Sequence, residues 1–585
     1  MSTSTQSIQY PTWTLLLPIA LGIAAFCLVV GIDPLIPTNI AWLSGQDPSQ
    51  HYLGWAFFRN SPWTNPIGLN PDYGLEISNA IAFSDSIPWM AFLFKPFSVF
   101  LPEPFQYIGL WVLLCFILQA WFSWKLSGLI TQDLALRLLI CGLLGVFAPP
   151  FLKRRGLHAA LMGQFLILAG LYFNLNNQIN HQNREKTNRT NAWSWLALLA
   201  LAALTNFYLL VMVFGLWLAY VFDRLLTHQY SFKEVTLKSL LIIGVIALCL
   251  WQTGYFVNSG APIQAEGFGQ YKLNVLSLFD AGRFSYFLKA IPHPEDLEEG
   301  FAFLGAGLLA LLVLLIISTS RSVLPQKNHS EKNPHSAITS DKASVVFGPA
   351  LWACLICFTV FALSNQISIG TWTWVYPLPE SLLQLASILR SSARFFWPVY
   401  YALVFLILRW VVKHFSRQKA LVILTIALAI QIIDTSAGWL PLRKTFAQLS
   451  QAQTPPTLSG PFWDAAGKRY QKVVIWPLRS GQTQEYWQAL SYFASQHQIG
   501  TNAVYLGRRA DPIKVAPSNQ AVLAQLEKGQ LSPDTLYVLS DKPTHQQWLN
   551  QQEFSKDTCV VKINGLIVIG PHWPDCDLTV TSTNQ

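Results

Sequence analysis

Residues 13–32 read WTLLLPIALGIAAFCLVVGI, and the polar segment Ser44-Gly45-Gln46-Asp47-Pro48-Ser49-Gln50-His51-Tyr52 follows shortly after. The first stretch carries no charge and has the length of about 20 apolar residues that a helix needs to cross a membrane. It predicts a spanning helix. The second stretch brings a carboxylate, an amide and an imidazole close to the end of that helix. Polar side chains at such places tend to mark function.

The composition of the whole chain supports this reading. The chain has 585 residues, of which 52% are hydrophobic and only 12% are charged. Soluble domains usually carry about 25% charged residues, so the composition predicts a polytopic α-helical membrane protein with lipids as its surroundings. The net charge is +9, but the basic residues gather in short loops between apolar stretches, without interleaved aromatics. This distribution argues against nucleic acid as a partner.

Apolar stretches recur along residues 1–437 and predict a transmembrane domain of about eleven spans. The first stretch lacks a basic leader and a cleavage site, so we expect it to stay as an anchor rather than to be removed as a signal peptide. The predicted spans are 13–32, 106–128, 134–151, 159–176, 192–206, 207–225, 237–256, 301–319, 347–365, 395–412 and 419–437.

The lysines and arginines predict the orientation of these spans. They are concentrated in the connections 177–191, 223–238, 320–343 and 409–419. Placing these connections in the cytoplasm puts the N-terminus inside, and the long first loop, 33–105, outside. That loop contains a short apolar stretch, Ile87–Leu101, which Lys95 and Pro96 interrupt. We expect an interfacial or re-entrant segment there rather than a span.

Residues 438–585 have a different pattern, which predicts a compact α/β domain outside the cytoplasm. No G-x-S-x-G, phosphate-loop or metal-ligand spacing occurs there, so we expect an accessory role in binding or docking. Asn564-Gly565 between two apolar runs indicates a hairpin. The predicted strands are Lys472–Trp476, Thr535–Leu539 and Cys559–Ile563, and the predicted helices are Trp487–Gln496, Asn519–Lys528 and Thr544–Gln552.

The cysteines fall into two groups. Six of the eight lie in predicted spans, among them Cys354 and Cys357, whose CxxC spacing has no histidine or carboxylate neighbour. We interpret that pair as packing rather than as a metal or redox site. Cys559 and Cys576 lie in the α/β domain, on the oxidising side of the membrane, and bracket the predicted hairpin. The compartment predicts a disulfide between them.

Two acidic segments of the first loop are candidates for chemistry. Asp47, Gln50 and His51 stand at i, i+3 and i+4 and would share one face of a helix. Asp47 suits a general base, or alternatively a helix N-cap ahead of Pro48. Asp85, in Ser84-Asp85-Ser86-Ile87-Pro88, suits a second carboxylate that orients an acceptor or binds a divalent metal ion. It also suits a helix cap.

Two cationic segments are predicted on the same outer side. The first is Lys153-Arg154-Arg155-Gly156-Leu157-His158, and the second, Arg390-Ser391-Ser392-Ala393-Arg394, places its arginines at i and i+4. Guanidinium groups are well suited to a lipid-linked phosphate. Anchoring to lipid headgroups is the alternative for both segments. Together, the acids and arginines favour transfer of a group from a lipid-linked phosphate donor.

On these segments the chain resembles the GT-C superfamily of integral-membrane glycosyltransferases, as an uncharacterised bacterial branch. The resemblance rests on residues 45–52, 83–88 and 390–397, on the many spans and on the outer C-terminal domain. It implies an inverting transfer of a sugar from a polyprenyl-phosphate-linked donor. By position it implies that Asp47 is the catalytic base, with Asp85 and His51 beside it. Arg154, Arg155, His158, Arg390 and Arg394 would bind the donor phosphate.

The resemblance leaves several points open. The clan commonly has paired Asp-Asp or Asp-Glu where this chain has Asp47-Pro48, so the single base and any divalent metal ion stay undecided. The implied acceptor is an envelope glycan or glycolipid on the periplasmic face of a bacterial inner membrane. The alternatives are a transporter or flippase of a lipid-linked sugar, and a non-catalytic envelope scaffold.

Overall fold

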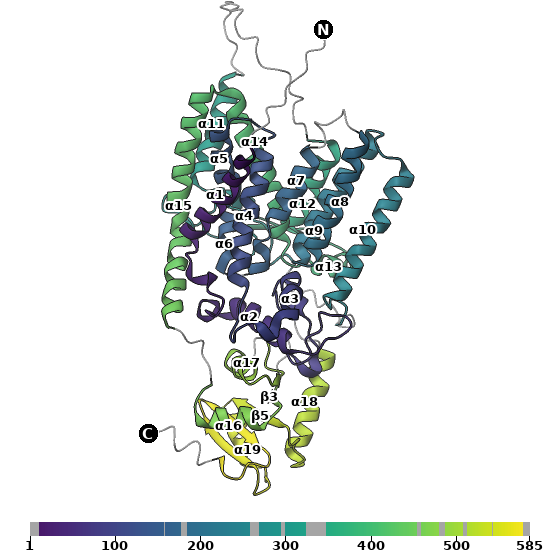
Figure 1. Cartoon of the computed structure of the whole chain (residues 1–585), viewed down its shortest axis with the longest axis vertical. Coiled ribbons are helices and arrows are strands. Elements are labelled where there is room, and N and C mark those ends of the chain that lie inside the picture. The colour runs from purple at the N-terminus through teal and green to yellow at the C-terminus, as the bar shows by residue number, and fades with distance from the viewer. Residues whose placement is uncertain are drawn as a thin grey trace, which may run out of the picture.

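Helices built from the predicted apolar stretches form a bundle, and a smaller α/β unit lies at one end of it (Figure 1). They belong to a computed structural model that describes residues 11–156, 158–176, 184–257, 268–293, 299–322, 347–452, 458–478, 486–506, 512–540 and 542–576. Parts of two predicted basic connections, residues 177–183 and 323–343, lie outside the described residues.

Within those ranges, seven helical stretches are long and apolar enough to cross a membrane. Their length and composition make the chain consistent with a membrane protein. They are built on α1 (Leu16–Val29), α4 (Ile108–Ser127), α7 (Phe165–Asn176), α9 (Phe207–Leu226), α10 (Phe232–Gln252), α14 (Trp397–His414) and α15 (Arg417–Ala452).

The other four predicted spans also fall on apolar helices, but these are shorter or broken. One is bent by 45° between residues 146 and 149, and counts as an eighth stretch if the bent pair is one span. Pro149 and Pro150 lack the N–H groups that a continuous helix needs there. The elements concerned are α5 (Leu134–Cys141), η7 (Gly142–Val146), α6 (Pro149–Lys153), η8 (Arg154–Gly156), α8 (Arg184–Ala203), α11 (Ala306–Ser322) and α12 (Pro349–Leu363).

Close helix packing and one very long helix hold the bundle together. A Cβ added at Gly22 of α1 would lie 2.7 Å from the Cα atom of Ile117, so α1 and α4 pack backbone to backbone at this point. Helix α15 has 36 residues and is about 54 Å long at 1.5 Å per residue. It continues past residue 437, so the predicted domain boundary at 437/438 falls inside a helix.

The first loop folds into short helices between the bundle and the α/β unit (Figure 1). The stretch predicted as interfacial or re-entrant forms α3 (Pro88–Phe94) and η6 (Lys95–Phe100), neither of which is long enough to cross a membrane. The longest helix of the loop is α2 (Gln46–Asn60). Its other short helices are η2 (Asp33–Leu35), η3 (Ala41–Leu43), η4 (Leu75–Ile77) and η5 (Ile81–Phe83).

The short elements elsewhere in the bundle are η1 (Thr12–Leu15), η9 (Ala159–Met162), η10 (Val275–Leu278), β1 (Gln366–Ile369), β2 (Trp372–Val375), α13 (Glu380–Ser387) and η11 (Ser392–Phe396).

The C-terminal unit contains a five-stranded mixed sheet in the order β4-β3-β5-β7-β6. The three predicted strands are confirmed as β3, β5 and β6, and the hairpin at Asn564-Gly565 joins β6 to β7. Both turn residues have positive φ, 53° and 74°, as a tight hairpin turn requires. The elements are α16 (Pro461–Arg469), β3 (Lys472–Ile475), α17 (Trp487–Gln496), β4 (Gly500–Thr501), α18 (Pro512–Glu527), β5 (Thr535–Ser540), α19 (Pro543–Leu549), β6 (Cys559–Ile563) and β7 (Leu566–Gly570).

The first loop docks directly onto this sheet. Tyr73 forms a parallel bridge with Thr501 of β4. The amide of Gly74 donates to the carbonyl of Thr501 (2.8 Å), and the amide of Thr501 donates to the carbonyl of Asp72 (2.9 Å). Tyr52 of α2 stacks on Tyr492 of α17 with ring centroids 5.8 Å apart. The edge of the sheet is therefore extended by the loop that carries Asp47.

Cys559 and Cys576 form a disulfide, with Cα atoms 5.9 Å apart. The other six cysteines are free thiols, so non-reduced protein should show six alkylatable groups. The bond closes a loop with a sequence separation of 17. Replacing both cysteines by alanine should lower the free energy of unfolding of the α/β unit by about 3 kcal/mol. Tryptophan fluorescence during urea unfolding measures this loss, and eight alkylatable thiols would contradict the assignment.

Candidate functional site

Helix α2 presents Asp47, Gln50 and His51 to the same region. Gly45, at φ +112°, is the N-cap residue, and the helix begins at Gln46. The N-cap alternative for Asp47 is therefore wrong, because Asp47 is the second residue of the helix. Its carboxylate Oδ1 accepts from the hydroxyl of Tyr505 at 3.3 Å. Gln50 Nε2 donates to the carbonyl of the same tyrosine at 2.9 Å, which confirms the shared face for these two.

Asp85 reaches the site from a strained turn packed against α2. Asp85 and Ile87 both have positive φ, 54° and 49°. A positive φ is an outlier for a β-branched residue such as Ile87, and backbone strain of this kind tends to cluster at functional sites. A Cβ at Gly54 would lie 2.1 Å from Ser84 Oγ, so only glycine lets the turn approach α2 this closely. Helix α3 starts at Pro88 with Ile87 as its N-cap, so the helix-cap alternative for Asp85 is wrong as well.

His158 lies between three carboxylates. Its Nδ1 is 3.7 Å from Asp85 Oδ2, and its Nε2 is 4.0 Å from Asp47 Oδ2 and 3.5 Å from Glu299 Oε1. The side chain of His158 is 24% exposed and those carboxylates are 17–19% exposed. The cluster is thus shielded but still open to solvent or to a ligand.

Glu299, which the sequence did not suggest as a site residue, joins the predicted cations. Its carboxylate pairs with Arg394, and Arg154 Nη1 lies 3.7 Å away. Arg154 also donates to the Glu299 carbonyl at 2.6 Å. Burial alone would raise the pKa of Glu299, but Arg394, His158 and Arg154 outweigh it and hold that pKa well below its usual range. Glu299 is therefore an anion at neutral pH.

The sequence around Glu299 contains one signal that could have indicated a site residue, a run of acidic residues. Glu299 ends the run Glu295-Asp296-Leu297-Glu298-Glu299, which has four acids in five residues just before a predicted span. Residues 294–298 lie outside the described residues. A Cβ at Gly300 would lie 1.9 Å from Cβ of Ala393, so the chain after Glu299 passes in close contact with the residue before Arg394.

The two other predicted cations lie elsewhere. Arg155 is buried and donates to the carbonyls of Leu152 (2.8 Å) and Trp439 (2.7 Å), which braces η8 against α15. Its side chain does not join the acidic cluster. Arg390 lies with its guanidinium carbon 5.8 Å from the ring centre of Tyr271, and its charge acts on Tyr505. It therefore belongs to the edge of the site.

The C-terminal unit contributes Tyr505. Burial, followed by the charge of Asp47, raises the pKa of this phenol to about 12, so it stays protonated and donates to Asp47. Gln488 of α17 donates to Ser49 Oγ on α2. The site is thus built from both parts of the chain, although no sequence motif marked residues 438–585 as part of it.

His51 is deeply buried within the cluster. Its side chain is 1% exposed, and its Nε2 lies 3.5 Å from Asp85 Oδ2. Burial lowers the pKa of His51, the nearby carboxylates notwithstanding, so the imidazole is neutral at neutral pH. The ligand atoms of His51, Asp85 and His158 all lie within 4.8 Å of one another, a grouping that fits a metal ion.

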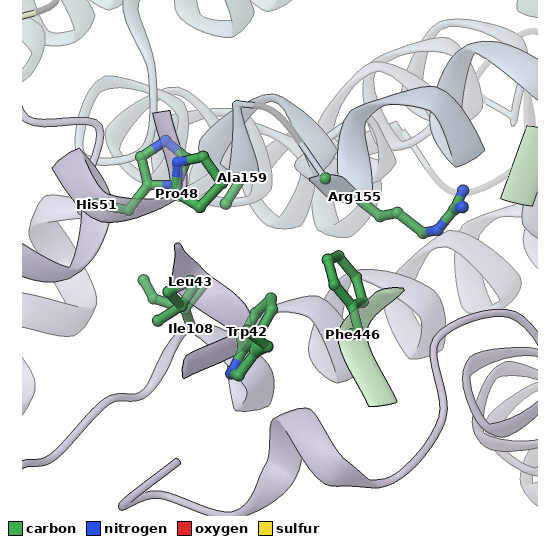
Figure 2. A pocket seen from close by; sticks show the side chains of 9 residues that line it. Trp42, Leu43, Pro48, His51, Ile108, Arg155, Ala159 and Phe446 are labelled. Atoms are coloured by element: carbon green, nitrogen blue, oxygen red, sulfur yellow. The ribbon is translucent and has the colours of Figure 1, made fainter. Parts of the chain in front are cut away.

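A hollow borders the cluster on the side of His51 (Figure 2). Figure 2 shows Pro48 and His51 together, with the side chain of Arg155 pointing away from them. The lining is mostly apolar, so the polar cluster borders an apolar surface on this side. The lining residues are Trp42, Leu43, Pro48, His51, Ile108, Arg155, Gly156, Ala159 and Phe446.

Fold and site together define a helical protein of membrane-spanning composition, with an acidic and cationic cluster where the bundle meets an α/β unit. A family model described as a domain of unknown function (DUF6311) matches residues 19–436, and the model of the DUF6311 C-terminal domain matches residues 462–571. The chain belongs to the DUF6311 family. No curated protein matches its sequence.

Proposed function

We propose that the chain is an inverting glycosyltransferase of the GT-C type in a bacterial inner membrane. It would move a sugar from a polyprenyl-phosphate-linked donor to an envelope glycan or glycolipid on the periplasmic face. One observation carries the proposal. Asp47 and Asp85 lie within 4.0 Å of His158, which Glu299 links to Arg154 and Arg394. A proton acceptor and phosphate-binding cations therefore lie next to one another.

In the proposed reaction Asp47 is the general base. It takes the proton of the acceptor hydroxyl as that oxygen attacks the anomeric carbon of the donor sugar. The new carbon–oxygen bond forms as the bond to the phosphate oxygen breaks, and the phosphate leaves with the electron pair. A single displacement of this kind inverts the anomeric centre. Tyr505 orients Asp47 through its hydrogen bond, and Asn206 orients Asp85 by donating to Oδ1 at 3.1 Å.

The leaving phosphate needs cations that are already in place. Arg394, with Arg154 behind it, would stabilise the developing charge, and Glu299 holds both guanidinium groups before the donor arrives. Arg390, at the edge of the site, completes the proposed pocket, and His158 connects it to Asp47 and Asp85. Arg155, which the sequence hypothesis assigned to the same pocket, is left out because its Nη1 and Nη2 groups donate to backbone carbonyls.

The proposal includes the topology expected from the basic connections. About eleven spans, with the N-terminus in the cytoplasm, would put the α/β unit in the periplasm. An alkaline phosphatase fusion at the C-terminus should be active, and a fusion within 177–191 should be inactive. Alkaline phosphatase is active only outside the cytoplasm, so the two fusions report the side of the membrane directly. The reverse pair of signals would overturn the orientation.

A transporter of the same lipid-linked sugar is the second candidate, and one observation favours it. The bent pair at residues 134–156 carries Arg154 in its last turn, and broken helices form the binding sites of many transporters. Mass spectrometry of envelope glycans from a deletion strain separates the two. If wild type restores a missing sugar and Asp47→Asn does not, the chain is an enzyme. If both restore it, glycosyl transfer by Asp47 is excluded.

A further inference from the structure

His51, Asp85 and His158 lie around a point that none of them fills. His51 Nε2 and His158 Nδ1 approach the same carboxylate oxygen, Asp85 Oδ2, at 3.5 and 3.7 Å. The third pair of ligand atoms lies within 4.8 Å. Ligands about 2.1 Å from a tetrahedral zinc ion are about 3.4 Å apart. The two short distances are close to this value.

Two atoms of this group lack hydrogen-bond partners. Among the described residues, His51 Nε2 and Asp85 Oδ2 are buried and have none, and His51 is 1% exposed. A buried polar atom without a partner costs about 1–3 kcal/mol. One cation between the two atoms satisfies both. This second observation separates the group from an ordinary cluster of polar residues.

The surroundings of the three side chains support a metal ion as well. Asn206 Nδ2 donates to Asp85 Oδ1 at 3.1 Å, which leaves Oδ2 to bind a cation. Glu299 Oε1 lies 3.5 Å from His158 Nε2 and accepts its hydrogen. The lone pair of that ring is then on Nδ1, the atom that faces Asp85. Metal-binding histidines characteristically donate their other nitrogen to a carboxylate in this way.

We propose that His51, Asp85 and His158 bind one divalent first-row transition-metal ion, Zn²⁺ by preference, with a fourth position left open. Two imidazoles and one carboxylate suit zinc and its neighbours, whereas Mg²⁺ and Ca²⁺ prefer oxygen ligands. Because it rests on the ligands alone, metal binding is independent of whether the chain transfers a sugar.

The test uses the full chain, purified in detergent, stripped with a chelator and titrated with Zn²⁺ alone. We expect one ion per chain, and a Co²⁺-loaded sample should show the intense visible absorption of a tetrahedral site. His51→Gln and Asp85→Asn should each abolish this stoichiometric binding. Glu299→Gln should weaken it by about 10–100-fold, since it removes only the partner of a ligand. His293→Gln is the matched control, because His293 lies 3.3 Å from Asp280 and belongs to no group of three such ligands among the described residues.

Three outcomes overturn the metal site. They are no Zn²⁺ bound by wild type above the stripped background, the spectrum of six-coordinate Co²⁺, or a preference for Mg²⁺ over Zn²⁺. The spectrum is measured on wild type, so the result stands even where a variant fails to fold. A chain that binds Zn²⁺ through these residues but transfers no sugar keeps the metal site and overturns the proposed function. A chain that binds no metal but transfers sugar overturns the metal site and keeps the proposed function.

Discussion

Replacing Asp47 by asparagine is expected to lower the rate of sugar transfer by about 10²–10⁴-fold, the usual cost of losing a general base. Asparagine keeps the size of the side chain, and its carbonyl oxygen still accepts from Tyr505. The fold and donor binding should therefore remain. The measurement is the initial rate with a prenyl-phosphate-linked donor and membrane-extracted acceptor, together with donor affinity.

Asp33→Asn is the control for this experiment, because Asp33 is another half-buried aspartate of the first loop and lies outside the cluster. Its rate should match that of wild type. If Asp47→Asn also transfers at the wild-type rate, Asp47 is not the base. If transfer is lost together with donor affinity and thermal stability, Asp47 is a structural residue.

Arg394→Ala should have the largest effect on stability. Arg394 is buried, pairs with Glu299, and lies 4.6 Å from the ring centre of Tyr208. Removing it leaves the carboxylate of Glu299 without its main partner, and breaking a buried ion pair typically costs about 3–5 kcal/mol. Donor binding should weaken as well, which raises the apparent KM. Thermal unfolding in detergent and donor titration measure the two effects.

A second substitution separates these effects. Glu299→Gln in the Arg394→Ala background removes the unpaired charge and should recover part of the stability, while donor binding stays weak. Arg417→Ala is the exposed counterpart, because its pair with Asp133 has an arginine that is 64% exposed. That change should cost less than about 1 kcal/mol. Equal losses for Arg394→Ala and Arg417→Ala would contradict the buried pair.

The helices could be predicted from the sequence because long apolar runs leave few alternatives. Each of the eleven predicted stretches contains an apolar helix, but their lengths depend on local chemistry. Pro149 and Pro150 break one of them, and the apolar part of α8 covers only Ala192–Ala203. In the C-terminal unit, the strands followed from apolar runs such as the β-branched residues 473–475 of β3. The two-residue strand β4 is too short to leave a pattern of its own.

The candidate site was predicted only in part, because its members come from distant segments. Asp47, Asp85 and His158 were found from local polarity, and the structure brings them together. Glu299 and Tyr505 were missed, since an acidic run and a lone tyrosine resemble ordinary surface residues. Arg155 was predicted as a site residue but does not join the site. It has the same local sequence pattern as Arg154, but its side chain points towards α15.

The hydrogen bond between Tyr505 and Asp47 joins residues that are 458 positions apart in the chain. At a synthesis rate of about 5–20 residues per second, the tyrosine leaves the ribosome roughly 20–90 s after the aspartate. For that interval α2 lacks Tyr492, Thr501 and the rest of its docking surface. A growing chain therefore carries the acidic half of the cluster long before the cluster can close. Synthesis of the segment that carries Tyr505 therefore sets the earliest moment at which the site can be assembled.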